Sequence, residues 1–340
     1  MNNVKILVWL SCVILNFSLC ISIYALEEYV PKVIIEAKWG TKPGEFGIKT
    51  FKYQPPIGPK VMFVTNGGDI YILDPLNQRI QKFNQDGKYQ TSINYIPTPH
   101  GDFFSECVHL EVTKDGLFLM AVPNSITGSN DILLLNRNGN LIRKFSAKEF
   151  NCEDLGILYD EKRNEYILVC GAKRELSPGN AEFYPVRKLK ILPDGRTENY
   201  KETKDLYKQK FSEWRVDKHT ILVKIENEQV TVKLEKKFID KGFSLGGVTT
   251  ARKDKNGNIN VSIMAIPEGK DMRDMKKWKW LLYKYDKNKN LIAIIEKQKY
   301  KGLKRAYEYM DDLGNFYQIC WDEEKLEEGV KIIKWVPKPK

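Results

Sequence analysis

Short strand-like runs alternate with tight-turn dipeptides at a regular spacing along most of the chain, and this repeat strongly constrains the fold. Runs of β-branched, aromatic and aliphatic residues are broken by Asp-Gly or Asn-Gly pairs, which supply the positive φ that hairpins need. The first turn of each unit is marked by Gly68, Gly116, Asn164, His219, Gly257 and Gly314. The markers span 314 minus 68 residues, so five intervals give about 49 residues per unit.

A unit of this length with four short strands is typical of the blade of a β-propeller. The sixth unit has only three strands before the chain stops at Lys340, and a further strand is available at the other end, in Val30–Gly40. Pairing of this segment with the last unit closes the ring and removes both exposed sheet edges. The sequence therefore predicts an all-β, six-bladed β-propeller over residues 26–340, with four antiparallel strands per blade.

One stretch of the chain, from Lys38 to Tyr89, resembles an NHL repeat. In that family a strand ends in Asp, Asn-x-Arg-Ile opens the next strand, and Phe precedes an Asp-Gly turn. The matching positions are Asp74, Asn77, Arg79, Ile80, Phe83, Asp86 and Gly87. The resemblance covers about fifty residues, decays in the later units and implies a six-bladed propeller. It implies little about activity, because propellers carry many unrelated functions.

Three residues of this motif, Asp74, Asn77 and Arg79, form a polar group that could be mistaken for an active site. They lie at the expected turn between the second and third strands of the first unit. Short polar side chains at such a turn bond to nearby backbone groups, and Arg79 has the length to reach a neighbouring carbonyl or carboxylate. We therefore predict a structural role for this group.

The N-terminal 25 residues form a separate segment. Lys5 precedes the apolar run Ile6–Ala25, and a polar stretch begins at Leu26. This arrangement is typical of a secretory signal, with cleavage expected after Ala25. The run is also close to the length that spans a bilayer, so an uncleaved N-terminal anchor is the alternative. Either one predicts an exported protein (periplasmic, envelope-associated or secreted) that meets a membrane only through this segment.

Four cysteines follow the N-terminal segment: Cys107, Cys152, Cys170 and Cys320. None belongs to a C-x-x-C pair, so the spacing gives no support for a zinc knuckle or a thioredoxin-type site. Cys107 and Cys152 occupy matching places just before the innermost strands of the second and third units. A disulfide between these two is therefore one expectation in an oxidising compartment, and four buried thiols are the other.

The repeat predicts where the candidate ligands of two kinds of metal site, zinc and calcium, lie in the ring. Peptide-amidating lyases, propellers of this broad type, hold zinc with three histidines, and this chain has His100, His109 and His219. The repeat places His109 and His219 at opposite ends of innermost strands, roughly 15–20 Å apart, too far for one zinc ion.

Propellers similar to gluconolactonase and strictosidine synthase hold calcium in the central channel. The corresponding oxygen ligands, at the expected starts of innermost strands, are Glu106, Glu153, Asp154 and Glu213. Solvated loop carboxylates are the alternative, and no other cofactor is expected.

Basic and aromatic residues recur in the connections that the repeat places on one side of the ring. The formal net charge is +11, from 55 Lys and Arg against 44 Asp and Glu. A predicted binding face comprises Lys173, Arg174, Arg273, Lys276, Lys277, Trp278, Lys279, Lys301, Lys304 and Arg305. Such a face binds polyanions by charge and planar groups by stacking. The alternative is a lysine-rich composition spread over all surfaces.

No complete catalytic set accompanies these motifs in the sequence. We therefore expect a non-enzymatic recognition module that presents loops to a protein, an anionic glycan or another anionic partner. Nucleic acid is not an expected partner of an exported protein. The alternatives are a divergent propeller hydrolase or lyase with a calcium ion in its channel, and a purely structural envelope component.

Overall fold

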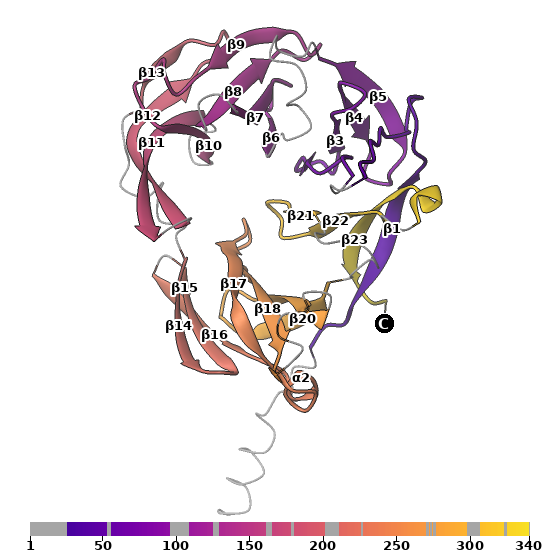
Figure 1. Ribbon diagram of the computed structural model, residues 1–340, viewed down its shortest axis with the longest axis vertical. Helices are drawn as coiled ribbons and strands as arrows, with labels where there is room; N and C mark the ends of the chain where they lie inside the picture. Colours follow the sequence, from indigo (N-terminus) through magenta and orange to yellow (C-terminus); the bar gives the residue numbers. More distant parts are fainter. Residues whose placement is uncertain are drawn as a thin grey trace, which may run out of the picture.

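The computed structural model describes residues 26–52, 56–95, 109–124, 129–160, 165–177, 180–200, 211–225, 227–269, 272, 274, 277–297, 307–322 and 325–339. The described strands form six antiparallel sheets arranged around a central axis (Figure 1). This arrangement confirms the predicted all-β propeller with six blades. We number the sheets as blades 1 to 6 in chain order.

The first three blades each have four described strands. Blade 1 consists of β2 (Met62–Val64), β3 (Ile70–Asp74), β4 (Arg79–Phe83) and β5 (Tyr89–Asn94). Blade 2 consists of β6 (His109–Val112), β7 (Phe118–Asn124), β8 (Ser129–Leu135) and β9 (Leu141–Phe145). Blade 3 consists of β10 (Asp154–Asp160), β11 (Glu165–Ser177), β12 (Asn180–Ile191) and β13 (Thr197–Asn199).

The second half of the ring contains one blade with three described strands and two with four. Blade 4 consists of β14 (Phe211–Asp217), β15 (Thr220–Ile225) and β16 (Glu228–Lys233), followed by the short helix α2 (Lys236–Ile239). Blade 5 consists of β17 (Phe243–Lys253), β18 (Ile259–Pro267), β19 (Lys279–Tyr285) and β20 (Leu291–Glu296). Blade 6 consists of β21 (Tyr307–Met310), β22 (Phe316–Cys320), β23 (Val330–Pro337) and β1 (Tyr29–Ala37), with the 3-10 helix η4 (Leu326–Glu328) before β23.

Tight turns in several blades are built on one hydrogen-bonding motif. The carboxylate of Asp254 accepts hydrogen bonds from the backbone N–H groups of Asn256 and Asn258, both at 2.9 Å. The β19–β20 and β21–β22 turns repeat this pattern. The fourth residue of the turn takes a left-handed φ, which is 82° at Gly257 and 68° at Lys289. The Asp-x-x-Gly pattern therefore specifies a hairpin, because glycine adopts this φ without strain.

The N-terminal strand closes the ring in blade 6, as predicted. β1 pairs with β23 in antiparallel register from Tyr29↔Pro337 to Ala37↔Val330. Ile35 and Ala37 of this strand are buried in the cluster that joins blades 6 and 1. The first and last segments of the folded chain therefore share one sheet, and neither β1 nor β23 is left as a detached end (Figure 1).

Apolar clusters lie between neighbouring blades and hold the ring together. Separate clusters join blades 6 and 1, 1 and 2, 2 and 3, 4 and 5, and 5 and 6. In the cluster of blades 1 and 2, for example, Leu73 and Ile80 pack with Leu110 and Met120. Burial of each such side chain contributes about 1.5–3 kcal/mol. Within the described part of the chain, no cluster joins blades 3 and 4.

The strands of blade 4 run in the opposite direction to the one that the sequence predicted, so each takes a different position in the blade. The repeat places the turn near His219 on the same side of the ring as the Asn256-Gly257 turn of blade 5. Instead, Lys218 Nζ lies 2.9 Å from Glu268 Oε1, just beyond the far end of β18. The carbonyl of Lys218 also accepts a 2.8 Å hydrogen bond from the backbone N–H of Leu245, near the start of β17. The turn therefore lies on the opposite side, and β14 runs antiparallel to the innermost strand β17.

β14, β15 and β16 therefore run as the second, third and fourth strands of the other blades do. The prediction that β14 is an innermost strand was wrong for a local reason. Asp217 accepts a 2.6 Å hydrogen bond from the N–H of His219, as in the first turns of other blades. The same turn chemistry thus serves two different hairpins, and the turn residues alone do not tell them apart.

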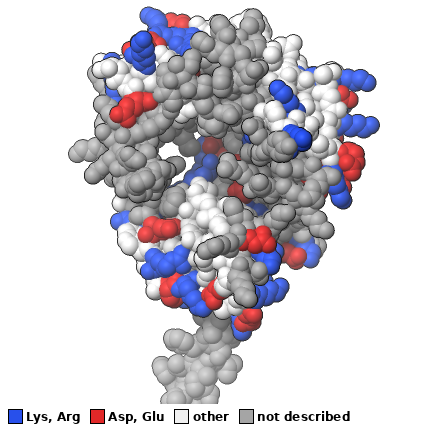
Figure 2. Space-filling view, in the orientation of Figure 1, with Lys and Arg blue, Asp and Glu red and all other residues white. Residues whose placement is uncertain are grey.

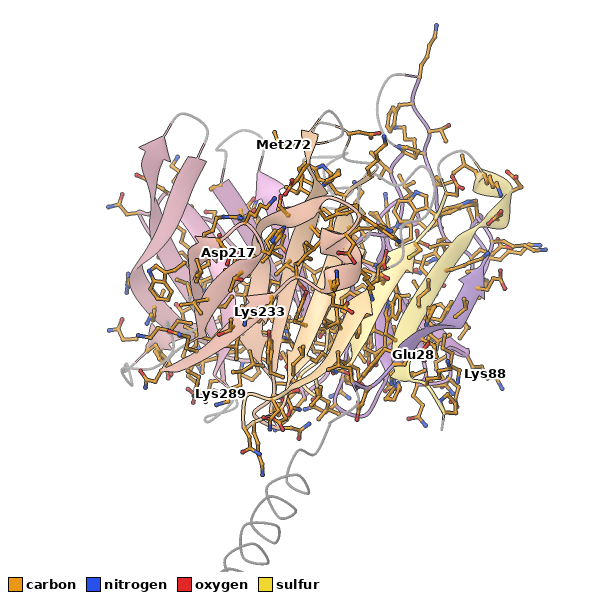
Figure 3. The ribbon with its side chains drawn as sticks, turned by 90° about the horizontal axis from the view of Figure 1, so that it is seen from below. Glu28, Lys88, Asp217, Lys233, Met272 and Lys289 are labelled. Atoms are coloured by element: carbon orange, nitrogen blue, oxygen red, sulfur yellow. The ribbon has the colours of Figure 1, made fainter. Side chains whose placement is uncertain are left out.

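The ring has two distinct sides (Figure 3). Lys88 and Lys289, which follow third strands, lie on one side, and Met272, in the connection between β18 and β19, lies on the other. We call the side that carries Met272 the loop face. The β14–β15 turn lies at this end of blades 4 and 5, because Lys218 contacts Glu268 and Leu245.

The predicted N-terminal leader, residues 1–25, lies outside the described residues. In the part of the chain that the structure describes, no helix has the length and apolar character needed to cross a membrane.

Candidate functional site

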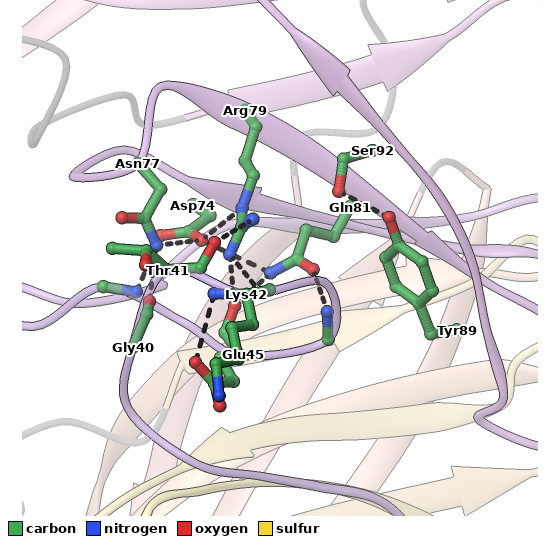
Figure 4. A network of polar contacts seen from close by, with 12 residues as sticks. Gly40, Thr41, Lys42, Glu45, Asp74, Asn77, Arg79, Gln81, Tyr89 and Ser92 are labelled. Atoms are coloured by element: carbon green, nitrogen blue, oxygen red, sulfur yellow. Dashed lines mark hydrogen bonds and ion pairs between the residues drawn. The ribbon is translucent and has the colours of Figure 1, made fainter.

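The polar residues of the NHL-like motif meet in a buried network on blade 1 (Figure 4). Asp74 ends β3, is 0% exposed and faces Arg79 across the hairpin. One carboxylate oxygen of Asp74 accepts a hydrogen bond from the N–H of Gly47 at 2.9 Å. The other accepts from Asn77 Nδ2 at 2.8 Å and from Arg79 Nε at 3.0 Å. Both oxygens of Asp74 are therefore used within the protein.

Arg79 extends this network into the segment that follows β1. Its terminal nitrogens donate to the carbonyls of Thr41, Lys42 and Glu45 at 2.8, 2.9 and 2.6 Å. Gln81 adds a 2.6 Å hydrogen bond from its Nε2 to the carbonyl of Glu45. Every nitrogen of the guanidinium group is satisfied by protein, so the network anchors residues 40–47 to blade 1 rather than offering donors to a ligand.

The four carboxylates considered as calcium ligands do not form a described cluster. Glu106 lies outside the described residues, and the side chain of Asp154 is not described. Glu153 is exposed beside the start of β10. Glu213 lies within β14, and its Oε2 accepts a 2.7 Å hydrogen bond from the N–H of Val248 on β17. Its expected place at the start of an innermost strand was therefore wrong. The described residues contain no group of three His, Cys, Asp or Glu side chains that could hold a metal ion.

The histidine positions also change with the phase of blade 4. His109 begins β6 and lies 3.0 Å from Glu111, through its Nε2. His219 lies in the β14–β15 turn on the loop face, not on the opposite side of the ring as the repeat count predicted. His100 lies outside the described residues.

The predicted basic binding face is described only in part. Arg273, Lys276, Lys301, Lys304 and Arg305 lie outside the described residues, and Lys173 and Arg174 are described as strand positions without their side chains. Of the remaining members, Lys277 is exposed, and Trp278 donates from its Nε1 to the carbonyl of Met272 at 3.0 Å. Lys279 lies 2.5 Å from Glu296, so its charge is compensated. In Figure 2, Lys and Arg are interspersed with Asp and Glu over the described surface.

Sequence reasoning missed a buried ion pair between blades 5 and 6. Lys297, whose side chain is 1% exposed, places its Nζ 2.5 Å from Glu308 Oε2 and 3.1 Å from Ser262 Oγ. The ammonium group also lies 5.2 Å from the ring centroid of Phe316. Burial lowers the pKa of Lys297, and the Glu308 carboxylate opposes that shift. The enclosed ammonium group joins two blades and is not presented to a ligand.

A second missed feature is a set of exposed apolar side chains on blades 4 and 5. Trp214 and Val216 of β14 are 50% and 59% exposed, and Met272 is 55% exposed. The Lys218–Glu268 ion pair joins the end of β14 to the start of the connection that carries Met272. We call Trp214, Val216 and Met272 the apolar patch. Large apolar side chains exposed on neighbouring elements are typical of an interaction surface.

Comparisons with known proteins give no family and no activity for the chain. No family model matches the sequence, and a search of curated proteins finds no relative. Among solved structures, the chain is similar to a member of the DUF4221 family from Bacteroides vulgatus, at 10% identity over 93% of this chain and 98% of the other, with a TM-score of 0.45.

Two other solved structures have comparable similarity. One is virginiamycin B lyase from Staphylococcus aureus, at 14% identity over 92% of this chain and all of the other, with a TM-score of 0.36. The other is a putative exported protein from Bacteroides fragilis, at 13% identity over 91% of this chain and all of the other, with a TM-score of 0.39. The likeness to NHL repeats stays a prediction from the sequence.

Proposed function

We propose that this chain is an exported, non-enzymatic recognition module that binds a protein partner through the loop face of blades 4 and 5. The observation that carries the proposal is the apolar patch. Tryptophan and other large apolar side chains supply much of the binding energy at protein interfaces, especially where polar and charged residues surround them. Export is supported by the signal-like sequence of residues 1–25.

Charged side chains of both signs surround the patch. In β14, Arg215 lies between Trp214 and Val216, and the exposed carboxylates of Glu213 and Asp217 lie on either side of them. The chain as a whole carries a net charge of +11, which favours encounter with an acidic surface. The partner we propose is therefore a protein that is acidic overall, buries apolar side chains against the patch and places charged groups of both signs around it.

Replacing Trp214 and Met272 together by serine is expected to reduce binding of the partner at least about tenfold, because an aromatic anchor at an interface is worth more than about 1.4 kcal/mol. Binding is measured as partner recovery by purified wild type and variant from an envelope extract of the source organism, with quantitative mass spectrometry. The recovered partner is then titrated against both proteins.

Leu313→Ser is the matched control for this experiment. Leu313 is also exposed, at 43%, but it lies in the β21–β22 turn on the side opposite the loop face. This variant should recover the partner as wild type does. Equal recovery by wild type and the Trp214/Met272 variant, with both folded, would contradict the proposed site.

A further inference from the structure

Two cysteine thiols lie together at the start of blade 3. Cys152 ends the turn that precedes β10, and its N–H donates to the carbonyl of Ala147 at 3.0 Å. The next residue, Glu153, donates from its N–H to the carbonyl of Gly171, also at 3.0 Å. Cys170, directly before Gly171, pairs with Leu155 in the β10–β11 register. This register and the Glu153–Gly171 hydrogen bond place Cys170 beside the turn that carries Cys152, and both residues pack in one apolar cluster.

Both thiols belong to the apolar cluster between blades 2 and 3. Cys170 is 1% exposed, whereas Cys152 is only half-buried at the edge of the cluster. Burial and, to a smaller extent, the neighbouring Cys152 thiol raise the pKa of the Cys170 thiol to about 12, and the charge of Arg187 opposes the shift. Cys152 is therefore the thiol that an external reagent reaches, and Cys170 is its enclosed neighbour.

We propose that Cys152 and Cys170 form an intramolecular disulfide that ties the turn before β10 to β11. The oxidant is a disulfide, either of a small thiol such as glutathione or of an exported oxidoreductase. Cys152 attacks the oxidant and releases one thiol, and Cys170 then attacks the mixed disulfide and releases the second. Two S–H bonds are lost and one S–S bond forms, while the two electrons and two protons pass to the oxidant as its two thiols.

This pairing competes with the Cys107–Cys152 bridge that the repeat suggests, since Cys152 can form only one bridge. Cys107 lies outside the described residues. The geometric argument for Cys170 is its place beside the turn that carries Cys152, fixed by the Glu153–Gly171 hydrogen bond and the shared apolar cluster, because a disulfide needs Cβ atoms about 3.5–4.5 Å apart. The inference does not depend on the proposed partner, and it is tested on the purified chain alone.

Tryptic peptide mapping without reductant decides between the pairings, because the three cysteines fall on different peptides. Cys107 lies in residues 89–114, Cys152 in residues 149–162 and Cys170 in residues 164–173. The folded protein is first reduced, then incubated with excess glutathione disulfide, and free thiols are blocked by alkylation before digestion. We expect residues 149–162 and 164–173 to be recovered as one linked pair, about 2 Da lighter than the two free peptides together.

Two further variants keep the result interpretable. Cys107→Ser should leave the linked pair unchanged. Cys152→Ser should abolish it, and the protein should still fold because position 152 is only half-buried.

In wild type, reductant should lower the melting temperature by on the order of 5 °C, because the link closes a loop in the unfolded chain. Recovery of both thiols alkylated after incubation, or of residues 149–162 linked to residues 89–114, would overturn the proposal.

Discussion

Replacing Asp74 by alanine is expected to lower the free energy of unfolding by about 3–5 kcal/mol. The substitution removes the acceptor of Arg79 Nε and of the Gly47 N–H, in a site where Asp74 is 0% exposed. The guanidinium group of Arg79 is then left in a nearly buried position without its counter-charge, which is more costly than losing a neutral hydrogen bond. Chemical denaturation followed by tryptophan fluorescence measures the change.

Two matched variants separate this effect from a general loss of charge. Asp74→Asn keeps the size of the side chain but not the charge, so it should destabilise the protein by part of the alanine effect. Asp194→Ala removes a carboxylate that pairs with Arg196 on the surface, where both side chains are at least half exposed. That variant should unfold at the wild-type midpoint. An Asp74→Ala protein as stable as Asp194→Ala would refute the structural role of the network.

Starting the chain at residue 38, which deletes β1, is expected to abolish cooperative folding or to lower stability by about 5 kcal/mol or more. The deletion removes the strand that pairs with β23 from Tyr29↔Pro337 to Ala37↔Val330. It also removes Ile35 and Ala37 from the cluster between blades 6 and 1. β23 would then present an unpaired edge, so the truncated protein should aggregate as well. Circular dichroism melting and light scattering measure both effects.

The control for this truncation starts the chain at residue 26. It removes residues 1–25 but keeps β1, including the hydrogen bond from the N–H of Lys338 to the carbonyl of Glu28. This protein should fold cooperatively and should not aggregate in light scattering. A chain that starts at residue 38 and melts at the same temperature as this control would contradict the role of β1 in ring closure.

The architecture was predictable because its determinants are local. Asp-x-x-Gly and Asn-x-x-Gly turns specify hairpins through their own backbone bonds, as at Asp254 and Gly257. Counting the first-turn markers, from Gly68 to Gly314, gave the number of blades. The closure was inferred from strand number, because the last unit lacked one strand and the N-terminus supplied a surplus one.

The phase of blade 4 was missed because the turn near His219 has the same local chemistry as a first turn. The intervals between the turn markers carried the information that could have revealed this shift. The interval from Asn164 to His219 is 55 residues and that from His219 to Gly257 is 38, whereas Gly68 to Gly116 is 48. A turn shifted by one strand produces one long and one short interval in this way. Treating the markers as equivalent and averaging over them concealed the shift.

The candidate sites were predictable only where the contact is short-range in sequence. Asp74 and Arg79 are five residues apart in one hairpin, and the reach of Arg79 to a neighbouring carboxylate and carbonyl was expected from the motif. The acceptors of Arg79 around Lys42, the contact of Cys152 with Cys170 and the pairing of Lys297 with Glu308 depend on how distant segments pack. Spacing alone does not specify such contacts, because they are set by tertiary packing.

Amide hydrogen exchange of the protein that starts at residue 26, followed by mass spectrometry, tests the closed ring most directly. In β1, about half of the amides point toward β23, and these should exchange as slowly as the amides of β22. Complete exchange of residues 29–37 within seconds, with β22 still protected, would contradict ring closure by the N-terminal strand.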